Sequence, residues 1–360
     1  MTEWRHDFHS HPELGFEEHR TSAKVADLLS DFGLSVHYGI GRTGIVGILE
    51  NGRSRRSIGL RADMDALPIS ETSHKSYSSE KEGTMHACGH DGHTSMLLGA
   101  AKYLAENKSF EGRVVFIFQP NEEHGLGASS MIEEGLFERF DVDDVYGIHN
   151  IPGMPIGTFS MRIGPITASE SLFEIIINAR GGHAALPQMG IDAIIVGTEI
   201  VQSLQTIVSR KLDPSLNGVV SVTEFITDGR RNILPGNAIL KGDARALNPE
   251  VNEAIEKHMK QIVEGISIAH GVKIQVKYDT VFPSVVNSSK PVIAAKRAAS
   301  QIVGSSMVNA SCSPKLFSED FGHMAATRPG CFIFMGNGIH GANAKPSNTI
   351  ILLLIVSLNM

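Results

Sequence analysis

Short apolar runs alternate with amphipathic helical patterns along the first 150 residues of the chain. Helical patterns at residues 21–32, 94–105 and 128–136 alternate with strand-like runs at residues 57–62, 113–118 and 144–148. Gly33 directly follows the first helical pattern and is a suitable helix stop. Because strands that alternate with helices pack into a parallel or mixed sheet covered by helices, this order predicts an α/β fold.

The pattern changes after residue 164. Phe173, Ile175 and Ile177 recur on one face of a strand, as alternation predicts. Helical patterns follow at residues 191–208 and 249–270, and strand-like patterns at residues 219–225, 238–245 and 272–278. The α/β pattern resumes near Ser288 and includes a strand at residues 331–335. We therefore predict a discontinuous domain of residues 1–164 and 281–360, with a smaller α+β domain of residues 165–280 inserted in it.

Composition argues against several classes of protein. The 32 Lys and Arg residues are scattered and the net charge is −7, so no basic face for nucleic acid is expected. The first residues are charged and rich in His, which predicts no signal peptide. Only Cys88, Cys312 and Cys331 are present, too few for a disulfide framework, which favours the reducing cytoplasm. The apolar run at residues 350–356 is far shorter than the roughly 20 residues that span a bilayer.

Polar clusters follow the predicted strands. Asp63 and Asp65 follow one strand, Glu122 and Glu123 follow the next, and His149 follows a third. In open α/β sheets, ligands bind beyond the carboxyl ends of the strands. With Cys88 and His90, which precede a predicted helix, these side chains offer thiolate, imidazole and carboxylate ligands for Zn²⁺ or a Mn²⁺-like ion.

Each of these clusters also has a simpler interpretation. Cys88 alone could be a small buried hydrophobe, and Asp65 could be a turn or cap residue rather than the acceptor that orients a metal-bound imidazole. Glu122 and Glu123 could form a solvated acidic turn, or one could bind metal while the other takes a proton from the metal's water. The residues alone leave these alternatives open.

The sequence resembles the M20 peptidase family, in particular its amidohydrolase branch, which includes hippurate hydrolases and indoleacetyl-amino-acid hydrolases. The matching stretches run through the chain to about residue 338 and include HSHPELGFEEHRTS (9–22), GLRADMDALPI (59–69), MHACGHDGHTSMLLGAA (85–101), FQPNEEHGLGASSMIEEGLF (118–137), GIHNIPGMPIGTF (147–159), GPITAS (164–169), GGHAALP (181–187), NILPGNA (232–238) and SEDF (318–321).

The resemblance implies a dinuclear-metal catalytic domain with an inserted lid or dimerisation domain. It implies two divalent ions per subunit, Mn²⁺ or Zn²⁺ with Co²⁺ or Ni²⁺ as alternatives, and a homodimer formed through the lid. The residues that it assigns are metal ligands Cys88, His90, Glu123 and His149, general base Glu122, oxyanion-stabilising His183, and substrate-facing Asn232 and Arg245. Arg245 could pair with the substrate carboxylate or make a structural ion pair.

The chain departs from the family pattern in places. Asn121 stands where the family has Ala, and Gln188 stands where a second His is frequent. The family's closing segment, which carries the last metal-ligating His, is replaced by a different C-terminus in which His340 is the only histidine. His340 could replace the missing ligand, but we expect that ligand to be absent.

We therefore expect hydrolysis of N-acetyl, N-benzoyl or arylacetyl amino acids to a carboxylate and a free amino acid, with a small molecule as substrate. The alternatives are a small-peptide carboxypeptidase or dipeptidase of the same family, and a catalytically impaired homologue with a damaged C-terminus. A third hypothesis makes Cys88 the nucleophile, with a histidine as its base.

Overall fold

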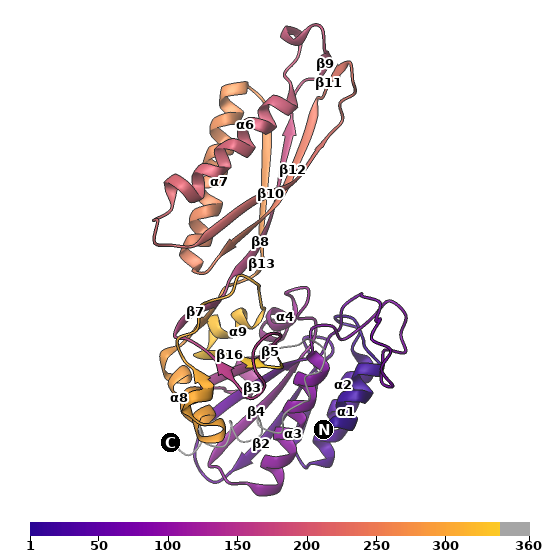
Figure 1. The fold of residues 1–360 in the computed structure, drawn as a ribbon, viewed down its shortest axis with the longest axis vertical. Helices are drawn as coiled ribbons and strands as arrows, with labels where there is room; N and C mark the ends of the chain where they lie inside the picture. The colour runs from indigo at the N-terminus through magenta and orange to yellow at the C-terminus, as the bar shows by residue number, and fades with distance from the viewer. Residues whose placement is uncertain (339–360) are drawn as a thin grey trace. The chain divides into compact units, whose positions relative to one another are not determined.

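The computed structural model describes residues 1–338 of the chain. These residues divide into two compact units, and the second is formed by residues 167–284 and 315–318. Figure 1 shows the order of their helices and strands by colour. Among the helices of residues 1–338, none has the length and apolar character needed to cross a membrane.

The first unit is built on an eight-stranded mixed sheet, which confirms the predicted α/β class. Its strands lie in the order β1 (Ser35–Ile40), β2 (Gly44–Asn51), β4 (Gly112–Gln119), β3 (Ser57–Asp63), β5 (Asp144–Ile151), β16 (Gly330–Gly336), β6 (Phe159–Ser160) and β15 (Val308–Asn309). Strands β4, β3, β5 and β16 run parallel to one another, whereas β2 is antiparallel to β4 and β6 is antiparallel to β16.

Both faces of this sheet are buried. Along β4, Val114, Phe116 and Phe118 belong to one apolar cluster, while Val115 and Ile117 belong to the other. The first cluster includes side chains from α1 (Thr2–Ser10), α2 (His19–Asp31), α3 (His90–Asn107) and α8 (Ser289–Val303). The second includes side chains from α4 (Gly127–Glu133), α5 (Leu136–Phe140) and α9 (Phe321–Thr327). Alternation along a strand therefore produces a three-layer arrangement, helix on sheet on helix.

The second unit is a four-stranded antiparallel sheet with helices on one face. The strands lie in the order β10 (Gly218–Thr227), β12 (Asn237–Ala246), β8 (Ser169–Asn178) and β13 (Lys273–Phe282). Helices α6 (Ala193–Thr206) and α7 (Pro249–His270) pack on Phe173, Ile175 and Ile177 of β8, as the alternation predicted. Figure 1 shows these two helices side by side.

Smaller ribbons complete the described fold. Strands β9 (Gly182–His183) and β11 (Ile233–Leu234) pair in the second unit. Strands β7 (Gly164–Thr167) and β14 (Val285–Asn287) form a further two-stranded sheet.

Candidate metal centre

The expected ligands converge at one edge of the larger sheet. Asp63 is the last residue of β3, and β3 runs parallel to both β4 and β5. The turn after β4 carries Glu122 and Glu123, and His149 lies near the end of β5. The hydroxyl of Thr94 donates to the Asp63 carbonyl at 2.9 Å, which fastens the first turns of α3 to the same edge.

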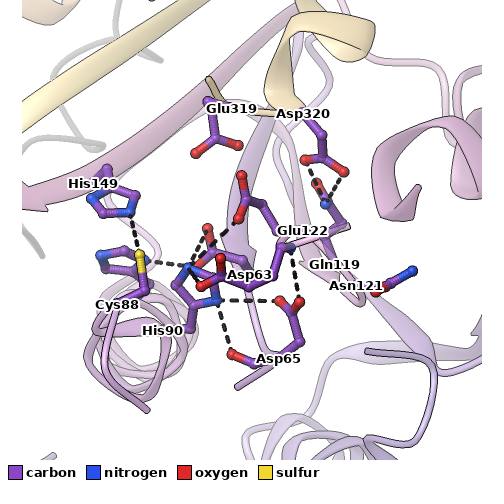
Figure 2. A network of polar contacts seen from close by, with 12 residues as sticks. Asp63, Asp65, Cys88, His90, Gln119, Asn121, Glu122, His149, Glu319 and Asp320 are labelled. Atoms are coloured by element: carbon purple, nitrogen blue, oxygen red, sulfur yellow. Dashed lines mark hydrogen bonds and ion pairs between the residues drawn. The ribbon is translucent and has the colours of Figure 1, made fainter. Parts of the chain in front are cut away.

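Cys88, His90 and His149 form one group of potential ligands. Their ligand atoms lie within 4.8 Å of one another. The Cys88 Sγ is 3.3 Å from the His149 Nε2. Figure 2 marks this contact with a dashed line. Cys88 stands just before α3, and Gly89 between it and His90 has a φ of +102°, a conformation that glycine adopts without strain. Sulfur and imidazole ligands in this arrangement suit a divalent ion such as Zn²⁺.

His90, Glu122 and Glu123 form a second group that shares His90 with the first. The His90 Nε2 is 3.8 Å from the Glu123 Oε1 and 4.0 Å from the Glu122 Oε2. Within residues 1–338, the His90 Nε2 and the Glu123 Oε1 are buried and make no hydrogen bond. Buried polar atoms are rarely left unpaired, so a cation between them fits this donor set.

Asp65 connects the imidazole to the acidic turn. Its Oδ1 lies 3.2 Å and its carbonyl oxygen 2.9 Å from the His90 Nδ1. Its Oδ2 accepts the backbone N–H of Glu123 at 3.0 Å. Held at Nδ1 by Asp65, the His90 ring directs its Nε2 toward the carboxylates, and Figure 2 shows this chain of contacts.

A buried ion network lies beside Glu122. The guanidinium of Arg61, from β3, is 2.6 Å from Asp63, 2.9 Å from Glu319 and 3.0 Å from Asp320. The ligand atoms of Glu122, Glu319 and Asp320 lie within 4.8 Å of one another. The sequence interpretation assigned no role to Arg61, Glu319 or Asp320.

Burial and crowding of like charges govern the protonation of this region. Burial, reinforced by Glu319 and Asp320, raises the pKa of Glu122 well above its usual range. Burial also raises the pKa of Asp320 to about 8, because Arg61 compensates only part of the surrounding negative charge. In contrast, burial lowers the pKa of His149 to about 3. A bound cation would reverse this preference for neutral forms, since it favours deprotonated ligands.

His183 and Asn232 lie together in the second unit. His183 is on β9, opposite Ile233 on β11, and the Asn232 carbonyl accepts the N–H of Ala184 at 3.0 Å. The His183 Nδ1 accepts the N–H of Ala185 at 3.1 Å. That contact places the ring proton on Nε2, which is then available as a donor on an exposed side chain.

Arg245 occupies a different part of the second unit, near the end of β12. Its guanidinium is 3.0 Å from Glu170 and 2.9 Å from Asp243, and it donates to the hydroxyl of Ser318 at 3.1 Å. The structural ion pair, one of the two alternatives for Arg245, is thus present. Recognition of a substrate carboxylate remains a prediction.

The prediction for His340 lies outside the described residues, as does the apolar run at residues 350–356.

The pattern of peptidase family M20/M25/M40 matches residues 59–351. The hippurate hydrolase of Campylobacter jejuni is 41% identical over 92% of this chain and 87% of its own. The N-acetylcysteine deacetylase of Bacillus subtilis is 36% identical over 92% of this chain and 87% of its own. The YXEP protein of Bacillus subtilis, described as a dinuclear metal-binding M20 peptidase, superposes with a TM-score of 0.82 at 31% identity, covering 99% and 94% of the two chains. The chain therefore belongs to peptidase family M20/M25/M40.

Proposed function

We propose that this protein is a metal-dependent amidohydrolase that cleaves N-acyl amino acids into a carboxylate and a free amino acid. The observation that carries the proposal is the shared position of His90 beside Cys88 and His149. Its Nε2 makes no hydrogen bond within residues 1–338 and lies within 4.0 Å of both Glu122 and Glu123. The names of the hippurate hydrolase and the N-acetylcysteine deacetylase support an N-acyl amino acid as the small-molecule substrate.

Cys88, His90, Glu123 and His149 would hold divalent ions, and Asp65 would orient His90 through its Nδ1. Two ions per subunit agree with the dinuclear site named for the YXEP protein, and Mn²⁺ or Zn²⁺ suits this donor set. When bound, such ions acidify water and polarise the acyl carbonyl.

Glu122 acts as the general base in this proposal. It takes a proton from the attacking water, whose oxygen forms the new bond to the acyl carbon. It then gives the proton to the nitrogen as the amide C–N bond breaks, so that the amine leaves neutral. Burial raises the pKa of Glu122 in the metal-free protein, and bound cations would favour the deprotonated carboxylate that a general base requires.

His183 stabilises the oxyanion by donating from Nε2, the tautomer that its contact with Ala185 favours. Asn232, on the adjoining segment, and Arg245 would contact the substrate.

The second unit supports a homodimer formed through this lid domain. Among the strands of residues 1–338, β10 lies at the edge of its sheet, so its outer backbone groups are available for pairing with a second copy. Phe225 and Ile226 on β10 are 40% and 47% exposed, and Ile194 and Ile195 on α6 are 42% and 59% exposed. A second copy would cover these apolar side chains. An Ile195→Asp variant that sediments as a monomer would support this interface, and an unchanged dimer would contradict it.

The proposed compartment is the cytoplasm, where the Cys88 thiol stays reduced.

The test of the function is release of free amino acid from N-acetyl, N-benzoyl and indoleacetyl amino acids, with a dipeptide panel alongside. Each reaction is run with Mn²⁺ or Zn²⁺ and again with a chelator. Metal-dependent release from acyl amino acids supports the proposal, whereas release from dipeptides alone favours the peptidase alternative. No release by folded, metal-loaded protein favours the impaired homologue.

A further inference from the structure

We propose that Glu18 is a positioning residue for the general base, and that its buried carboxylate holds the turn carrying Glu122 and Glu123. This inference rests on the proposed function for its catalytic meaning. Glu18 itself contacts neither the expected metal ligands nor the expected substrate residues through any hydrogen bond described for residues 1–338.

The turn after β4 contains a backbone conformation that is unfavourable for most residues. Asn121, which directly precedes Glu122, has a φ of +48°. The left-handed region costs an L-residue roughly 1–2 kcal/mol, although Asn tolerates it better than most residues. Within the turn, the N–H of Gly127 donates to the Asn121 carbonyl at 3.1 Å. Contacts from outside the turn are therefore important for holding Asn121 in place.

Glu18 supplies one such contact. Its Oε1 accepts the backbone N–H of Asn121 at 2.8 Å. Its Oε2 accepts the hydroxyl of Thr43 at 2.6 Å, and the residue is 0% exposed. With both oxygens engaged and no solvent around it, the carboxylate has little freedom to move. The N–H that it fixes belongs to the residue next to the base.

Asp65 holds the other side of the same turn in place through a hydrogen bond. Its Oδ2 accepts the N–H of Glu123 at 3.0 Å. Glu122 therefore lies between two anchored backbone N–H groups, that of Asn121, held by Glu18, and that of Glu123, held by Asp65. A displacement of either anchor would move the Glu122 carboxylate relative to His90.

The segment that contains Glu18 packs closely against this turn. A Cβ atom on Gly15 would lie only 1.8 Å from the Asn121 Oδ1, so any larger residue there would displace Asn121. The same Oδ1 lies 2.6 Å from the His124 Nδ1. The carbonyl of Glu13 accepts the N–H of Ala66 at 2.8 Å, beside Asp65. The backbone carbonyl of Glu13 and the side chain of Glu18 thus support the two loops that carry the site.

Glu13 provides a matched control in the same segment. Its side chain accepts the N–H groups of Arg20 and Thr21 at 3.0 Å and 2.8 Å, at the start of α2. That carboxylate accepts backbone N–H groups at the start of α2 that lack a partner within the helix. The contact of Glu13 with Ala66 is made by the backbone carbonyl, which a substitution keeps.

The experiment compares Glu18→Gln, Glu18→Asp and Glu13→Asp with the wild type. Gln keeps the length of Glu18 and an acceptor oxygen for Asn121, whereas Asp keeps the charge but is one methylene too short to reach both partners. The two readouts are kcat and KM for the best acyl amino acid, and hydrogen exchange of residues 119–126 in the metal-free protein.

We expect Glu18→Asp to lower kcat by about a hundredfold, the loss typical of a 1 Å misplacement, with KM little changed. Exchange of residues 119–126 should be faster in this variant. Glu18→Gln and Glu13→Asp should keep kcat and exchange near those of the wild type.

The proposal is overturned if Glu18→Gln loses as much kcat as Glu18→Asp, or if Glu18→Asp changes neither readout. If Glu18→Asp fails to fold, a large loss of kcat in folded Glu18→Gln still overturns it. If the wild type hydrolyses no substrate, the proposed function has failed, and the exchange of residues 119–126 decides whether Glu18 holds the turn.

Discussion

The Sγ of Cys88 and the Nε2 of His149 lie 3.3 Å apart, although 61 positions separate the two residues in the chain. A thiolate ligand and a thiolate nucleophile would both fit this contact, and metal binding distinguishes them. We expect Cys88→Ala to lower affinity for Zn²⁺ at least about tenfold, since a soft anionic ligand is lost.

Equilibrium dialysis of the variant against Zn²⁺ measures this loss. Cys312→Ala, at the other half-buried cysteine, is the control and should bind Zn²⁺ normally. A Cys88→Ala protein that keeps its metal and loses all hydrolysis would instead support Cys88 as the nucleophile.

Glu122 and Glu123 are neighbours in sequence but have different expected roles. Glu122→Gln should lower kcat by roughly 10²–10⁴, the range of general acid–base catalysis, while metal content stays at the wild-type level. Glu123→Gln should lose metal, because a neutral amide is a weaker ligand than a carboxylate. Metal analysis and kinetics on the two purified variants provide the check. Near-normal turnover in Glu122→Gln would show that another group removes the proton.

Arg61 compensates three buried carboxylates, so its loss should destabilise the fold. Arg61→Met should lower the free energy of unfolding by roughly 3–5 kcal/mol at pH 8, as expected when a buried charge loses its partner. The cost should shrink toward pH 5, because burial raises the pKa of Asp320 to about 8 and this carboxyl is protonated at pH 5. Urea titrations at the two pH values measure the difference.

The matched control is Arg113→Met. Arg113 pairs with Glu50 on the surface, where both side chains are more than a third exposed, so its loss should cost under about 1 kcal/mol. Equal effects of the two substitutions would contradict the importance of the Arg61 network.

The edge of the sheet at which the site forms could be predicted from sequence. Polar residues after parallel strands meet at one edge, and Asp63 and His149 do so. The partners of Arg61 could not be predicted. A charged residue within the apolar strand 57–62 signals a buried partner, but Asp320 lies 259 positions away, and only the fold brings it near.

The boundaries of the helices were less predictable than those of the strands. The helix expected at residues 128–136 is two helices, α4 and α5, because Gly135 has a φ of +85° and interrupts the α-helical backbone. Helix α3 begins at His90, before the expected residue 94. Its first turn carries polar residues of the candidate site, so apolar periodicity did not reveal it.

Glu18 should make stability depend on pH in a specific direction. Burial, opposed by its hydrogen bonds to Thr43 and Asn121, raises the pKa of Glu18 from 4.5 to about 7. Below pH 4.5 the group is protonated in both the folded and unfolded chain. Between 4.5 and about 7 the unfolded chain gives up this proton first, so the free energy of unfolding falls as pH rises.

The fall attributable to Glu18 is about 3 kcal/mol, which follows from a pKa of 4.5 in the unfolded chain and about 7 in the folded protein. Glu18→Gln removes the titration, so the variant should gain stability relative to the wild type as pH rises from 4.5 to 7 and hold that gain above 7. Urea unfolding of both metal-free proteins across this range measures the gain. A constant difference between them would mean that Glu18 ionises as readily in the folded protein as in the unfolded chain.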